Sequence, residues 1–212
     1  MKRLTNRNTG RITIAAGIVA LIGTIALIEF MVAGNSGLLS DNMTIYTSLL
    51  SIPLMIALGK MANTHNGSLS SYGQVIGVLG AAINFIGGII NVNALSGNIE
   101  YYQSASWIYV GSGLIGIAIL IFALQERKNP DRAKGFVWLS IVFGLAMTMN
   151  FIALAFRDEL NAFMRFEISF AEVNLFLRLM MFTGSPIVIL GQPIWLIWAG
   201  RLFVKDKLSI PE

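Results

Sequence analysis

The chain has 212 residues, of which 55% are hydrophobic and only 12% are charged, and its formal net charge is +4. A soluble domain carries about 25% charged residues, so this composition argues against a soluble globular protein and indicates a chain that contacts lipid. The sequence contains no cysteine, which excludes disulfides, thiolate metal sites and thiol redox chemistry.

Six long apolar stretches follow one another along the chain. A helix needs about 20 residues to cross the roughly 30 Å hydrocarbon core of a bilayer, and it satisfies its own backbone hydrogen bonds there. The predicted spans cover residues 12–33, 43–61, 73–95, 107–124, 136–156 and 186–204. The sequence therefore predicts one all-α domain over residues 1–212, a polytopic transmembrane helix bundle with six spans.

The basic residues alternate between the two ends of the predicted spans. Twelve of the 15 Lys and Arg residues lie in the N-terminal tail, at the end of the second span, between the fourth and fifth spans, and at the C-terminal end of the chain from Arg201 onwards. Only Arg157, Arg165 and Arg178 lie on the other side. Since Lys and Arg mark the cytoplasmic side, both termini are predicted to be cytoplasmic. The basic residues do not alternate with aromatic ones in a stripe, which argues against nucleic-acid binding.

The segment 157–185 is the longest connection between spans. Its apolar content predicts a helix over about 160–182, on the outer surface or as a tilted extension of the last span. Residues 184–186 (GSP) predict a break, because proline lacks a donor and disfavours helix in the residue before it. Charges on two faces suggest a lid, with Arg178 or Glu172 pointing onto the bundle. The alternative is ordinary ion pairing at the surface, which is worth tenths of a kcal/mol.

Small and polar residues recur at three- and four-residue steps in the third span, which places them on one helical face. Small residues let helix backbones approach closely in membranes. The predicted packing positions are Gly73, Gly77, Gly80 and Gly87 in the third span and Gly113 and Gly116 in the fourth. Asn84 and Asn91 share the face of the third span, where they either bond across helices or line a polar cavity.

Glu29 is the only carboxylate that lies well inside a predicted span, near its outer end. Charged groups in a membrane are costly and usually face the protein interior or a water-filled cavity. If the helices are adjacent, Glu29 converges with Asn91 and Asn150 on an outward-side polar site. The alternative is that Glu29 simply reaches the lipid headgroups. The ligand-binding candidates are Glu29, Asn84, Asn91, Asn150, Arg178 and Gln192.

The sequence offers no catalytic motif, no metal-binding cluster and no indication of a cofactor. His65 is the sole histidine and lies in a polar loop, so one chain cannot supply two axial histidines to a haem. The usual histidine-rich and cysteine-based chemistries of intramembrane enzymes therefore lack their residues.

Two short stretches carry a family resemblance. Residues 9–12 (TGRI) lead into the first span, and residues 186–198 (PIVILGQPIWLIW) form most of the last. They resemble uncharacterised bacterial six-helix membrane families, described as domains of unknown function. The resemblance implies an inner-membrane location and no particular activity, so it assigns no site residues.

Two hypotheses for function follow. In the first, the protein binds or transports a small molecule or ion at an outward-side polar site. In the second, it is an accessory or structural subunit whose small-residue faces dock a larger membrane complex. The expected partners are the lipid bilayer, a small-molecule ligand, and a membrane-protein partner or a second copy of the chain.

Overall fold

The computed structural model describes residues 5–33, 37–62, 67–94, 101–127, 129, 133–164 and 167–208. These residues are helical apart from short turns, and they contain no strand. Within them, six helical stretches are long and apolar enough to cross a membrane, which confirms the predicted fold class. His65 and Arg165 lie outside the described residues.

The spans are longer than the sequence predicted. They are α1 (Asn6–Ala33), α2 (Leu38–Ala62), α3 (Gly67–Ala94), α4 (Tyr101–Glu126), α5 (Lys134–Thr148) continued by α6 (Asn150–Ala155), and α9 (Ser185–Val204). The last span also includes α8 (Leu175–Leu179) and the π-helical turn η2 (Met180–Gly184), which run into α9. Between α6 and α8 lie α7 (Arg157–Met164) and the 3-10 turn η1 (Phe170–Glu172).

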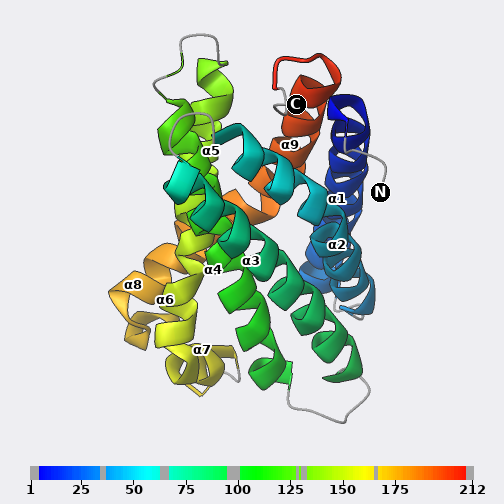
Figure 1. Cartoon of the computed structure of the whole chain (residues 1–212). Helices are drawn as coiled ribbons and strands as arrows, with labels where there is room; N and C mark the ends of the chain where they lie inside the picture. The colour runs from blue at the N-terminus through cyan, green and yellow to red at the C-terminus, as the bar shows by residue number, and fades with distance from the viewer. Residues whose placement is uncertain are drawn as a thin grey trace.

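The six spans form a closed ring. Each span packs against its neighbours in the sequence, and α9 returns to pack against both α5 and α1. The start of α1 and the end of α9 lie at one end of this ring, here called the terminal end, and α7 lies at the opposite end (Figure 1). The ring therefore has a terminal end and an α7 end. The side chains that point into the ring differ between these two ends.

Glycine allows the neighbouring backbones to approach closely. A Cβ atom at Gly80 would lie 2.7 Å from the carbonyl oxygen of Gly111 on α4. The seam between α1 and α9 is equally tight, because a Cβ at Gly10 would lie 2.6 Å from the carbonyl oxygen of Gly200. Each of the six predicted packing glycines lies against a neighbouring helix: Gly73, Gly77, Gly80, Gly87, Gly113 and Gly116.

Large apolar side chains fill the ring towards the terminal end. The indole ring of Trp195 stacks on Phe143, with centroids 5.5 Å apart, and on Phe136, with centroids 6.0 Å apart. Its Nε1 donates a hydrogen bond to Ser140 Oγ at 2.8 Å, so the one polar atom of this buried side chain is satisfied. Phe203 lies in the same buried cluster.

The segment before the last span differs from the prediction. An additional helix is present, but the stretch expected over 160–182 is divided: α7 ends at Met164, and the last span already begins at Leu175. The predicted break at residues 184–186 is wrong, because Gly184 has helical backbone angles (φ −66°, ψ −55°) and the helix continues. The π turn changes the hydrogen-bonding register just before Pro186, whose nitrogen cannot donate.

A polar cavity near the α7 end of the ring

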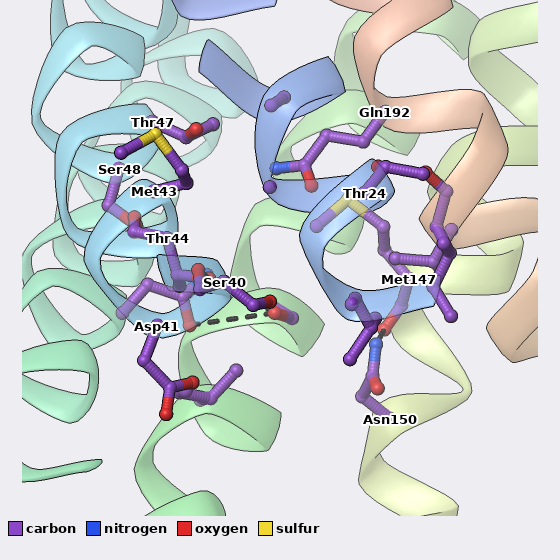
Figure 2. Close-up of a pocket in the computed structure, with 18 of the residues that line it drawn as sticks. Thr24, Ser40, Asp41, Met43, Thr44, Thr47, Ser48, Met147, Asn150 and Gln192 are labelled. Atoms are coloured by element: carbon purple, nitrogen blue, oxygen red, sulfur yellow. Dashed lines mark hydrogen bonds between the residues drawn. The ribbon is translucent and has the colours of Figure 1, made fainter. Parts of the chain in front are cut away.

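A cavity of about 340 Å³ lies inside the ring, and all six spans contribute to its wall. Its volume falls within the range of about 300–1,000 Å³ that is typical of small-molecule sites. Figure 2 shows the cavity with side chains from several helices around it, including Asp41 and Asn150 on opposite sides. The polar side chains in the wall are Thr24, Ser40, Asp41, Thr44, Thr47, Ser48, Asn84, Asn91, Tyr109, Ser112, Asn150, Ser185 and Gln192.

Four of the six residues predicted from the sequence line this cavity, namely Asn84, Asn91, Asn150 and Gln192. Asn84 is buried, and its Nδ2 donates to Ser112 Oγ on α4 at 3.2 Å. The Nδ2 of Asn150 donates to the carbonyl oxygen of Met147 at 2.8 Å. The polar face of the third span therefore does both things that the sequence left open: it bonds across helices and it lines a cavity.

Glu29 does not line the cavity. Its side chain is exposed on the outside of α1, beside the exposed Ile28 and Phe30. α1 instead turns Gly23, Thr24 and Leu27 towards the cavity. Two residues correspond to about 200° of rotation on an α-helix, so Glu29 points away from the face that carries Leu27. The expected convergence of Glu29 with Asn91 and Asn150 is therefore wrong.

Arg178 also lies away from the cavity. It belongs to α8, where its guanidinium carbon lies 5.8 Å from the centroid of the Phe170 ring. A separate apolar cluster, which includes Leu160, Val173 and Leu177, holds this segment together. None of the described residues between 151 and 184 lines the cavity, so this described part of the chain does not form the expected lid over it. In Figure 1 α6, α7 and α8 lie together at one side of the bundle.

The charged residue of the cavity wall that the sequence analysis missed is Asp41. α2 begins at Leu38, five residues before the predicted span, so Asp41 lies in the first helical turn and not in a loop. Only 7% of its surface is exposed, and its carboxylate accepts a side-chain hydrogen bond from Asn91. The available signal was a polar stripe at helical spacing, formed by Asp41, Thr44 and Ser48 together with Thr47 and Ser51.

The cavity is rich in hydrogen-bond acceptors and contains the carboxyl group of Asp41. Within the part of the chain that the structure describes, Asp41 is the only charged residue that lines it. Three buried oxygens in the wall have no hydrogen-bond partner in the structure: Asp41 Oδ2, Thr47 Oγ1 and Asn91 Oδ1. A buried polar atom without a partner costs about 1–3 kcal/mol, and a charged one costs more. The wall is therefore suited to a bound group that donates hydrogen bonds.

The described residues contain no group of three or more His, Cys, Asp or Glu side chains that could hold a metal ion. The polar side chains in the cavity wall carry carboxylate, amide and hydroxyl groups. Such groups hold a solute by charge and hydrogen bonds. Comparisons with known protein families, with curated proteins and with solved structures find no match to this chain.

Proposed function

We propose that this is a multi-pass membrane protein that binds a small polar solute in the cavity at the α7 end of its ring. The observation that carries the proposal is the cavity itself, which is polar and yet lies among six apolar spans. Polar groups within a membrane are costly, so a wall that combines a carboxylate, several amides and hydroxyls needs polar contents to satisfy it.

The distribution of charge supports an orientation with the cavity on the outer side. Arg7, Arg11, Arg201, Lys205 and Lys207 belong to the terminal end of the ring. An excess of Lys and Arg favours the cytoplasmic side of an inner membrane. In this orientation both termini are cytoplasmic and the solute enters from outside.

The alternative of an accessory subunit has no separate support. Apolar side chains such as Val75, Leu79 and Val142 are exposed on the outside of the spans. Contact with lipid alone requires such a surface, so these faces do not point to a protein partner.

The proposal can be tested by filling the cavity. Ser48 lines it, whereas the next residue, Leu49, is exposed on the outside of α2. Ser48→Phe should place a phenyl ring in the cavity, and Leu49→Phe is a control that adds bulk on the lipid side. Small molecules extracted from each natively purified variant are identified by mass spectrometry. A panel of polar solutes is then tested for its effect on the melting temperature in detergent.

We expect the wild type and Leu49→Phe to retain or respond to the same solute, and Ser48→Phe to lose it. If every solute behaves alike with the wild type and Ser48→Phe, the cavity is not a binding site and the proposal fails.

The orientation has its own test, since the chain has no native cysteine. Asp158 and Lys205 are exposed residues at opposite ends of the ring. Asp158→Cys should react with a membrane-impermeant thiol reagent added to intact cells, whereas Lys205→Cys should react only after the membrane is opened. The reverse pattern would place the cavity on the cytoplasmic side.

A further inference from the structure

We infer that the solute is a small organic cation, whose ammonium group donates to Asp41 at the α7 end of the cavity. This inference rests on the proposed function, because it assumes that the cavity binds a solute, and it adds the chemical class of that solute. Three features carry it: the charge of the wall, its unsatisfied acceptors and their spacing.

The charge of the wall comes from one residue. Asp41 is 7% exposed, and no Lys, Arg or His is among the described residues that line the cavity. Buried charges in proteins are normally paired, because removal from water without a counter-charge is costly. The hydrogen bond from Asn91 satisfies part of the carboxylate but supplies no positive charge. A cationic solute would provide the missing counter-charge.

The oxygen atoms without a hydrogen-bond partner favour a solute that donates hydrogen bonds. Asp41 Oδ2 and Asn91 Oδ1 have no partner, and both residues are more than nine-tenths buried. A carboxylate oxygen and an amide oxygen can only accept hydrogen bonds. An ammonium group has donors and no acceptors, and donor and acceptor form shorter, stronger hydrogen bonds when they are charged. An anionic solute would repel Asp41 and leave both acceptors unsatisfied.

The spacing favours an organic cation over a bare metal ion. Thr47 Oγ1 is also buried without a partner, and Thr47 lies six residues after Asp41 on α2. This separation corresponds to about 9 Å along the helix axis, too far for one ion to contact both residues. The cavity also has apolar walls, including Met43, Met147 and Val188. A solute with an ammonium group at Asp41, a short carbon chain along the apolar wall and a hydroxyl group towards Thr47 would match these three parts of the cavity.

The test uses the full-length protein in an uncharged maltoside detergent, and its melting temperature is read from tryptophan fluorescence. The probes are n-butylammonium chloride, 4-amino-1-butanol in its protonated form, n-butanol as the neutral analogue, and sodium chloride at matched ionic strength. We expect saturable stabilisation by the two ammonium probes and none by n-butanol or sodium chloride. This comparison of probes does not depend on any variant being able to fold.

Variants then assign the effect to residues. Asp41→Asn keeps the shape of the side chain and removes the charge, so the apparent affinity for n-butylammonium should fall about tenfold or more. Glu29→Gln removes a carboxylate outside the cavity and should bind like the wild type. Thr47→Val should weaken binding of 4-amino-1-butanol more than binding of n-butylammonium, because only the former has a hydroxyl.

The outcomes separate this inference from the proposed function. If n-butanol stabilises the protein as well as n-butylammonium does, and Ser48→Phe abolishes both effects, the cavity binds solutes without using its charge and only this inference fails. An unchanged affinity in Asp41→Asn, or equal stabilisation by sodium chloride, also overturns it. If neither ammonium probe gives saturable stabilisation, the inference is wrong.

Discussion

The two ends of the ring are built from the same six spans but are filled in opposite ways. Towards the terminal end, Trp195 stacks on Phe136 and Phe143 within a buried apolar cluster. Towards the α7 end, the inward side chains are short and polar, as with Thr44 and Ser48, and they surround a cavity of about 340 Å³. The size and polarity of the inward side chains therefore decide where the ring is sealed and where it is hollow.

The boundary between the two regions lies at Met147, which belongs to the buried apolar cluster and also lines the cavity. A solute that enters from the α7 end would meet this side chain and the aromatic cluster beyond it. The cavity therefore borders the buried aromatic cluster on the side of Met147. Onward passage would require Trp195 and Phe143 to separate, which makes the aromatic cluster the barrier to test first.

The largest effect should come from opening the sealed region. Trp195→Ala removes a fully buried indole and leaves Ser140 without its donor, which should destabilise the protein by about 3–5 kcal/mol. The measurement is unfolding in detergent followed by circular dichroism. Trp138→Ala is the control, because 58% of Trp138 is exposed. Equal stability of the two variants would show that the aromatic cluster does not hold the ring together.

The next effect concerns the seam between α3 and α4, which both regions share. A side chain at Gly80 would meet the backbone of Gly111 and Ile115 at 2.7 and 2.9 Å, and backbone atoms cannot move aside cheaply. Gly80→Leu should therefore destabilise the protein by about 1–3 kcal/mol or more. Ile76→Leu, a substitution of similar volume on the same helix, should be close to neutral. Identical melting temperatures of the two variants would show that the close approach of α3 and α4 at Gly80 does not contribute to stability.

The sequence predicted the six spans of this molecule well, because a span depends on local composition. The length of an apolar run determines whether a helix can cross a membrane, and six such runs were sufficient to predict six spans. The glycine spacing of the third span likewise indicated a close-packed face, and Gly80 does lie directly against α4. Helix ends were less predictable, since polar residues at a membrane boundary can remain helical, as in the first turn of α2.

The residues that line the cavity could not all be predicted, because the lining depends on how each helix is rotated about its axis. The sequence of a mostly apolar helix does not indicate this rotation. Glu29 and Leu27 are two residues apart on α1, yet only Leu27 lines the cavity. Nothing in the surrounding apolar sequence distinguishes these two faces. Asp41 was missed for a different reason: its place in a helix became clear only once α2 was known to begin at Leu38. The asparagines were found because their polarity stands out within a span.

A smaller effect should separate stability from binding in the hollow region. Thr47 carries a buried hydroxyl without a partner, and Thr47→Val replaces it with a methyl group of similar size. Removing an unsatisfied polar group should leave the stability unchanged or raise it by up to about 1 kcal/mol. Urea or thermal unfolding without added solute measures this change. A loss of stability would mean that the Thr47 hydroxyl supports the fold, and the cavity would then be part of the packing.

The smallest effect tests whether the segment beside the bundle is independent of the cavity. The carboxylate of Glu172 accepts hydrogen bonds from the backbone nitrogen and the hydroxyl of Ser169, both at 2.7 Å. These bonds lower the pKa of Glu172 from its ordinary value of 4.5. A lowered pKa in the folded state means that the turn is stabilised above about pH 4.5. The stabilisation is lost as the pH falls through the lowered value.

The carboxyl carbon of Glu172, followed by NMR in a nanodisc, should therefore titrate below pH 4.5. Ser169→Ala removes the hydroxyl donor and should move this titration towards the ordinary value, because one of the two bonds is lost. The same variant should bind n-butylammonium like the wild type, since neither Ser169 nor any other described residue between 151 and 184 lines the cavity. A change in that affinity would mean that the 169–172 turn acts on the cavity wall, and the segment would then have to be considered part of the site.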